Sequence, residues 1–103
     1  MHIQINAPHR TLPDSFVAHV ENRLNEALAP HAKRLSRLEV HFQDLNGQKG
    51  GIDKRCLLEA RPRGLDPVAA EDLGEAFEGA FRGALEKLQR VLERRFGRLS
   101  SRD

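Results

Sequence analysis

Residues 37–61 read RLEVHFQDLNGQKGGIDKRCLLEAR, and the pattern of this stretch decides the fold. Apolar and polar side chains alternate over residues 38–42, which predicts a strand that buries one of its faces. A glycine-rich loop with an Asn-Gly turn signal follows at 44–53. Alternation resumes over 54–61, so the stretch predicts two antiparallel strands joined by a loop.

The segments on either side supply two more strands and two helices. Residues 2–6 alternate with period two and predict a short first strand. A helix should begin near Asp14, because the proline before it suits a first helical turn and an acid there favours the positive end of the helix dipole. Pro30 lacks an amide hydrogen and should end or kink that helix. Residues 65–70 predict a weaker last strand, and Asp72 should begin a long final helix.

The expected order is β-α-β-β-β-α, an α+β fold in a single domain of residues 1–103. The crossover through the first helix should make strands one and two parallel, and two hairpins should add strands three and four in antiparallel pairing. Both helices should then cover one face of a four-stranded sheet, as in double-stranded-RNA-binding domains with their α-β-β-β-α order. The other face should carry the polar side chains of Arg37, His41, Arg55 and Arg61.

Composition is that of an ordinary soluble protein. The chain is 39% hydrophobic and 31% charged, which allows one core and does not resemble a disordered sequence. Its first residues lack the basic stretch and apolar core of a signal peptide, and no apolar run approaches the roughly 20 residues of a membrane span. The single cysteine, Cys56, excludes an intrachain disulfide. We therefore expect a cytoplasmic protein without a membrane partner.

The charges of the last third are separated along the chain. Residues 65–81 contain five acids and no base, whereas residues 82–102 contain seven bases and two acids. The five acids are Asp66, Glu71, Asp72, Glu75 and Glu78. The formal net charge of the whole chain is only +2, so the average conceals a concentrated basic end. Such an end on a rigid helix suits the phosphate backbone of a nucleic acid, because each neutralised phosphate releases counterions.

Four of these bases fall on one stripe of the final helix. At 100° per residue, Arg90, Arg94 and Arg98 lie within about 60° of Lys87, and the stripe is about 16 Å long. Bases near a helix C-terminus also complement its dipole, but that effect is confined to the last turn, and Lys87 and Arg90 lie earlier. Like charges four residues apart repel each other. The stripe therefore favours a phosphate-binding surface over a merely solvated helix face.

Recognition of bases by stacking is not expected. The chain has no Trp or Tyr, and four of its five Phe fall on predicted apolar faces. These four are Phe16, Phe42, Phe77 and Phe81. An RNA would therefore be bound mainly through its phosphates and its shape.

The interior of the final helix contains two glycines, Gly79 and Gly83. Each costs about 1 kcal/mol relative to alanine in a helix. Their spacing leaves a smooth patch on one side of the helix. We expect the patch to admit close packing of the first helix, in preference to an approaching RNA backbone.

No set of residues predicts catalysis or a bound metal. The five histidines show no metal-ligand spacing, and Cys56, on the apolar face of its strand, has no second thiol. The glycines of the 44–53 loop lack the Gly-Lys-Ser/Thr sequence of a phosphate loop. We therefore expect a protein that is not an enzyme and has no metal, no cofactor and no small-molecule substrate.

Two motifs, in a β-α-β-β-β-α chain of this length, carry a family resemblance. One is the loop Asp44-x-Asn46-Gly47-x-Lys49-Gly50-Gly51-x-Asp53-Lys54-Arg55-Cys56. The other is the helix pattern Ala80-x-x-x-Ala84-x-x-Lys87-Leu88-x-Arg90-x-Leu92. Together they resemble the bacterial ribosome hibernation-promoting factor and ribosome-associated inhibitor A family, also called ribosomal subunit interface proteins. The resemblance covers nearly the whole chain.

The resemblance implies a stationary-phase or stress factor that binds the small ribosomal subunit, and hence the 70S ribosome, in the channel between head and body. Such a factor covers the paths of mRNA and of A- and P-site tRNA, and so inhibits translation. The residues implied to contact 16S rRNA are Lys87, Arg90, Arg94, Arg98, Lys54 and Arg55.

The sequence departs from the family pattern in several places. A tyrosine often found early in the last helix is absent, and Glu21 and Glu26 offset Arg23 on the first helix. The sequence ends at Asp103, without the carboxy-terminal domain by which long members pair ribosomes. A short form is therefore expected.

Two other functions remain open on the sequence. A general double-stranded RNA reader would share the element order and the basic last helix. A protein–protein adaptor would dock an acidic partner on the charged helix or a sheet edge, with no RNA involved. Strong binding to a plain RNA duplex would indicate the first, and a pull-down insensitive to nuclease the second.

Overall fold

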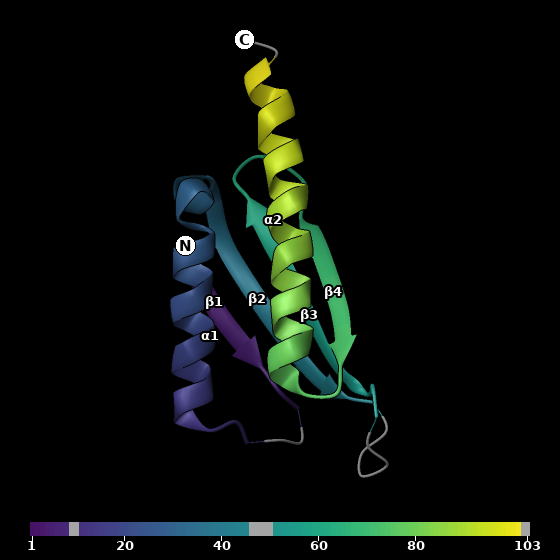
Figure 1. Cartoon of the computed structure of the whole chain (residues 1–103). Helices are drawn as coiled ribbons and strands as arrows, with labels where there is room; N and C mark the ends of the chain where they lie inside the picture. The colour runs from purple at the N-terminus through teal and green to yellow at the C-terminus, as the bar shows by residue number, and fades with distance from the viewer. Residues whose placement is uncertain (9–10, 46–50, 102–103) are drawn as a thin grey trace.

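The computed structural model describes residues 1–8, 11–45 and 51–101, the last four of them by backbone only. Its elements are β1 (His2–Asn6), α1 (Asp14–Ala27), the 3-10 helix η1 (Ala29–Arg34), β2 (Leu35–Asp44), β3 (Lys54–Pro62), β4 (Val68–Gly74) and α2 (Phe77–Ser101). The predicted β-α-β-β-β-α order and the α+β class are confirmed (Figure 1).

The four strands form one sheet in the order β1-β2-β3-β4. β1 is parallel to β2, and the other two pairs are antiparallel, as predicted. In the central pair, Val40 lies opposite Leu58, and Phe42 lies opposite Cys56. All four side chains are buried, because the alternation of the two strands brings their apolar residues to the same face.

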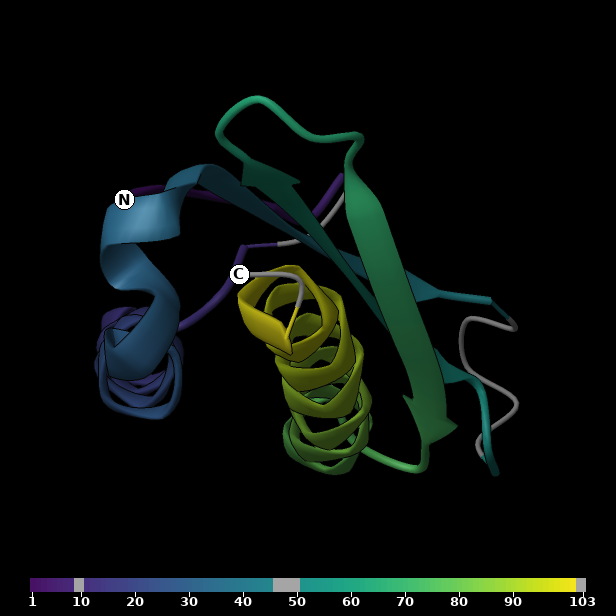
Figure 2. The same ribbon diagram turned by 90° about the horizontal axis from the view of Figure 1, so that it is seen from above.

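Both helices cover that apolar face, as the view along α2 shows (Figure 2). α1 buries Val20 and Leu24, and α2 packs chiefly against β3 and β4 and touches α1 little. Each fully buried aliphatic side chain contributes about 1.5–3 kcal/mol relative to an exposed one. The largest fully buried apolar side chains of the core are Phe42, Phe81, Leu24, Leu28, Leu35, Leu38, Leu58, Leu88 and Leu92.

The boundary between β4 and α2 differs from the predicted one. β4 stays paired with β3 as far as Gly74, and α2 begins at Phe77 instead of Asp72. The acidic residues around Asp72 favour the start of a helix. The backbone of β3 can pair with the same residues, and in the structure they form strand hydrogen bonds with β3 instead of a helical turn. Gly74 marks this boundary in the sequence. A Cβ atom there would lie only 2.9 Å from the backbone nitrogen of Ala80, so the turn into α2 requires a residue without a side chain.

The burial of two leucines follows from this boundary. Leu73 lies on β4 and is 47% exposed. Leu85 lies on α2 and is only 3% exposed, in the core. The apolar face of α2 therefore meets the sheet from Phe77 onward.

The two helix glycines do not receive α1, so that prediction was wrong. A Cβ atom on Gly83 would overlap the carboxylate of Asp72, which reaches the helix from β4. A Cβ atom on Gly79 would meet nothing within 4 Å. Gly83 thus makes room for one strand side chain, and Gly79 faces open space.

The molecule is elongated, with extents of 51 × 23 × 19 Å, because α2 projects beyond the end of the sheet (Figure 1). Phe96, which is 5% exposed, packs where the helix leaves the sheet. Its ring lies 5.2 Å from the ring of His31 and 4.9 Å from the guanidinium carbon of Arg34. η1 therefore supports the projecting part of α2. No helix in the described ranges is both long and apolar enough to cross a bilayer.

Candidate nucleic-acid interface

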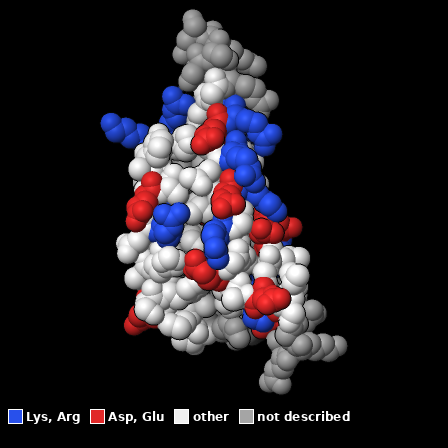
Figure 3. Space-filling view, viewed as in Figure 1, with Lys and Arg blue, Asp and Glu red and all other residues white. Residues whose placement is uncertain are grey.

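The basic stripe forms along the C-terminal half of α2. Lys87, Arg90 and Arg94 are all exposed, and Lys and Arg side chains gather on this part of the surface (Figure 3). The side chain of Arg98 lies outside the described residues, although its backbone continues the helix. The stripe is thus a surface feature of α2 and not part of its core packing.

Lys87 is held at the β4 edge. Its Nζ donates a hydrogen bond to the backbone carbonyl oxygen of Glu71 at 3.2 Å and lies 3.4 Å from Oδ1 of Asp72. The side chain is 48% exposed, and such surface ion pairs contribute about 0–1 kcal/mol. The Asp72 carboxylate that occupies the space above Gly83 therefore also places the first base of the stripe.

Beyond Lys87 the stripe continues with Arg90 and Arg94. Arg90 is exposed, and none of the ion pairs among the described residues involves it. Arg94 is exposed as well, and Arg95 beside it is half-buried. The stripe therefore carries exposed positive charge along α2.

Arg55 of β3 contacts β4 on the face of the sheet opposite Lys87. Its Nε donates to Oε2 of Glu71 at 2.8 Å, and its Nη1 lies 3.4 Å from Oε1 of Gln43. Glu71 therefore receives Arg55 on its carboxylate and Lys87 on its carbonyl, which brings these two predicted site residues to the two sides of β4. The sequence pattern had predicted a strand that ends at residue 70 and a helix that begins at Asp72, so neither pairing was expected.

Lys54 is placed differently from the other predicted site residues. Its Nζ lies 2.8 Å from Oδ1 of Asp53, a fully buried residue, and 3.2 Å from Oδ2 of Asp44. The hydrogen bond to Asp53 raises the pKa of Lys54 despite opposing desolvation. Leu45 also donates its backbone N–H to the carbonyl oxygen of Asp53 at 2.8 Å. Lys54 thus ties together the two ends of the β2–β3 loop, and its charge is already matched by two carboxylates.

A second group of bases, which the sequence analysis did not single out, lies beside the projecting helix. Arg63 donates its backbone N–H to the carbonyl oxygen of Arg34 at 2.8 Å and its Nε to that of Lys33 at 3.3 Å. Lys33, Arg34 and Arg63 are all exposed, and Phe96 of α2 contacts the Arg34 guanidinium. We call these three residues the basic end. Their only sequence signal is that bases follow Pro30 and Pro62, and the tertiary fold brings them together.

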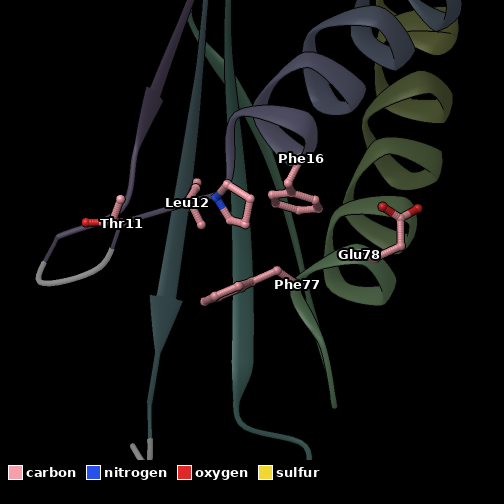
Figure 4. A pocket seen from close by; sticks show the side chains of 6 residues that line it. Thr11, Leu12, Phe16, Phe77 and Glu78 are labelled. Atoms are coloured by element: carbon pink, nitrogen blue, oxygen red, sulfur yellow. The ribbon is translucent and has the colours of Figure 1, made fainter.

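The aromatic rings lie elsewhere. Phe42 and Phe81 are buried, as predicted, and Phe96, for which no face was predicted, is buried as well. Phe16 and Phe77 are half-buried and line an apolar pocket at the N-terminal ends of the two helices (Figure 4). Both rings also pack on Phe42, at 5.4 and 5.2 Å between ring centroids. The basic stripe begins about ten residues further along α2 than Phe77.

Cys56 is a core residue, as predicted. Its side chain is buried, and burial raises the pKa of its thiol to about 12. The thiol is therefore protonated at neutral pH, and a nucleophilic thiolate is not available.

The fold and the basic helix together define a class of small α+β proteins: a four-stranded sheet, two helices on one face, and bases on the last helix. Residues 3–100 match the family model described as "Sigma 54 modulation protein / S30EA ribosomal protein". The chain belongs to this family, which confirms the resemblance seen in its sequence and associates the protein with the ribosome.

Two solved structures share the fold. A ribosomal subunit interface protein from Coxiella burnetii aligns with a TM-score of 0.79 and 18% identity, over 94% of this chain and 99% of that one. The N-terminal domain of Protein Y from Thermus thermophilus aligns with a TM-score of 0.73 and 19% identity, over 91% of this chain and 98% of that one. No curated protein sequence matches the chain.

Proposed function

We propose that the protein is a ribosome hibernation factor of the cytoplasm. In this proposal a single domain binds the small ribosomal subunit, free or within the 70S ribosome, and contacts 16S rRNA in the decoding channel. The bound protein excludes mRNA and the A- and P-site tRNAs by occupying their space, so translation stops without any chemistry. Family membership supports the ribosome as the partner. The exposed bases of α2 support phosphate as the group that is contacted, and they carry the proposal.

The six proposed rRNA contacts differ in what binding would cost. Arg90 loses no protein ion pair described in the structure, and arginine can bind a phosphate through two parallel hydrogen bonds. Lys87 and Arg55 would share their charge with Asp72 and Glu71. Lys54 would give up buried partners, so we assign it the smallest contribution. Arg94 and Arg98 extend the contact toward the end of the helix.

The basic end enlarges this surface. Lys33, Arg34 and Arg63 come from η1 and the β3–β4 connection, and Phe96 joins them to α2. If an RNA groove received the projecting helix, the stripe and the basic end could therefore contact phosphates on more than one wall of that groove. The formal net charge of the chain is only +2, so attraction to RNA depends on this local concentration and falls as salt screens it.

The decisive experiment compares two charge reversals of equal size. Arg90→Glu/Arg94→Glu changes the stripe, whereas Arg23→Glu/Arg82→Glu changes two exposed arginines outside it. Each variant is sedimented with purified small ribosomal subunits at about 50 and 200 mM salt. Lys87 is left intact, because its contacts with β4 would confuse loss of binding with loss of structure.

We expect wild type and Arg23→Glu/Arg82→Glu to bind and to weaken steeply with salt. Arg90→Glu/Arg94→Glu should bind more weakly, with a slope of log K against log[salt] reduced by about one unit per lost phosphate contact. Equal binding by the two variants would remove the stripe from the interface. Absence of wild-type protein from the ribosomal fractions at low salt would end the hibernation proposal itself.

Two further assays separate the other functions. A plain RNA duplex of about 16 base pairs, the length that double-stranded-RNA-binding domains span, should compete poorly with the small subunit. Tight duplex binding would identify a general RNA reader instead. Capture of a protein partner that survives nuclease treatment would identify an adaptor.

A further inference from the structure

The face of the sheet that the helices leave open has an unusual charge register. Glu39 of β2 lies directly opposite Glu59 of β3, and Arg37 lies directly opposite Arg61. Like charges in directly opposed positions destabilise a sheet unless an opposite charge separates them. The two arginines approach one oxygen of Glu39, its Oε2, at 3.3 and 3.5 Å. Among the described residues, His41 is the only basic side chain within ion-pair distance of Glu59.

His41 lies between the two carboxylates. Its Nε2 is 3.3 Å from Oε1 of Glu39 and 3.4 Å from Oε1 of Glu59. This nitrogen is buried and has no hydrogen-bond partner within the described part of the chain. The three atoms all lie within 4.8 Å of one another. An imidazole and two carboxylates therefore converge on one small volume.

Two of the three separations match those between ligands of one metal ion. Two ligands on a tetrahedral zinc ion, each about 2.0–2.1 Å from the metal, lie about 3.3 Å apart. Nε2 of His41 lies 3.3 and 3.4 Å from the two carboxylate oxygens. The two oxygens lie within 4.8 Å of each other, so all three groups can reach one ion.

We propose that Glu39, His41 and Glu59 form a binding site for a divalent transition-metal ion, with zinc as its best-fitting occupant. One imidazole nitrogen and two carboxylate oxygens are a ligand set that zinc accepts, and the half-buried residues leave a fourth position for water. Histidine ligates through a neutral ring, so Nδ1 must carry the proton when Nε2 binds. The amide nitrogen of Asn6 lies 3.5 Å from Nδ1, and turning this amide by 180° in the metal-bound state would place its oxygen to accept the Nδ1 proton.

The flanking arginines act on the ligands and not on the metal. They form ion pairs with Oε2 of Glu39 and leave its Oε1 near His41, and such outer contacts orient a ligating carboxylate. Their two positive charges offset the two carboxylates, so the site has no excess negative charge to attract a cation. We therefore expect weaker binding than at a closed thiolate zinc site.

The site lies on the face of the sheet opposite α2, the face that also carries Arg55, and its test measures metal binding to the protein without RNA. Its test is a titration of the whole protein with Zn²⁺, followed by calorimetry and by the imidazole NMR signals of the five histidines. The variants are His41→Gln and Glu59→Gln. His19→Gln is the matched control, because His19 also lies beside a glutamate, 2.9 Å from Glu78, but has no second carboxylate among its described contacts.

We expect one equivalent of Zn²⁺ to shift the ring signals of His41 in the wild type and in His19→Gln. His41→Gln should lose this binding, and Glu59→Gln should weaken it at least tenfold, with circular dichroism unchanged in both. Mg²⁺ should not compete, because it prefers oxygen ligands in octahedral geometry. Zinc shifts at other histidines only, or equal affinity in His41→Gln and wild type, would overturn the proposal.

Discussion

At the scale of single residues, burial dominates the chemistry of Cys56 and outweighs the opposing charge of Arg55. Cys56 lies opposite Phe42 in the centre of the sheet, and the loss of solvent raises the pKa of its thiol from 9.0 to about 12. Lys54, two residues before it, has its pKa raised chiefly by a hydrogen bond to Asp53. Both groups hold their protons more tightly in the folded than in the unfolded chain, so alkaline pH favours unfolding.

The first prediction concerns this pH dependence. Below pH 9 the thiol is protonated in both the folded and the unfolded chain, so it does not make the free energy of unfolding depend on pH. Between pH 9 and 12 only the unfolded chain loses the proton. The contribution of Cys56 to the free energy of unfolding should therefore fall by about 1.4 kcal/mol per pH unit in that window. Urea titrations from pH 8 to 11 should show a steeper decline for wild type than for Cys56→Ala. Parallel profiles would contradict the assignment.

At the scale of elements, the junction of β4 and α2 positions the basic stripe. Asp72 fits against Gly83, accepts the backbone N–H of Leu73 at 2.9 Å through Oδ1, and reaches Lys87 with the same atom. One strand carboxylate therefore fixes the start of the stripe relative to the sheet.

The two helix glycines give the second prediction. Gly79→Ala should raise the free energy of unfolding by about 0.5–1 kcal/mol, because it gains helix propensity and its Cβ meets open space. Gly83→Ala should fail to gain this amount, because the new methyl group displaces the Asp72 carboxylate. Urea unfolding of the two variants measures the difference.

A double-mutant cycle supplies the control for that prediction. In an Asp72→Ala background the obstacle is gone, so Gly83→Ala should become stabilising by about as much as Gly79→Ala. If Gly83→Ala were equally stabilising in both backgrounds, the contact with Asp72 would carry no weight.

The same junction shows how far the sequence predicts the fold. Alternation in β2 and β3 predicted the sheet, its pairing and its buried face correctly, because one apolar side per strand leaves little freedom of register. The β4–α2 boundary was wrong, because an acidic run has good local reasons to begin a helix, and only the long-range partner β3 overrides them.

At the scale of the whole molecule, the ring of Phe96 joins the C-terminal part of α2 to η1. Phe96 packs on His31 and Arg34 of η1, so it connects the last helix to the segment that follows the first. Periodicity along α2 predicted the stripe itself. It could not predict that Glu71 and Asp72 lie under the stripe, or that Lys33, Arg34 and Arg63 lie near its far end.

The third prediction tests this support. Phe96→Ala should lower the free energy of unfolding by about 3 kcal/mol, in the range for large-to-small core changes, whereas Phe96→Leu should lose less. If the projecting helix must be held in place to meet RNA, Phe96→Ala should also weaken binding to small subunits at a temperature where the sheet remains folded. Unchanged binding in the folded variant would show that the stripe acts without this support.

The buried position of Cys56 has a practical consequence for following the protein on a ribosome. The chain has no Trp or Tyr, so it adds almost no near-ultraviolet absorbance of its own to an RNA-rich particle. Because the one native thiol is enclosed and protonated, a cysteine introduced at exposed Asn22 on α1 would be the only one to react with a maleimide dye. The anisotropy of that dye would then report arrival and departure of single molecules without changing any residue of the basic stripe.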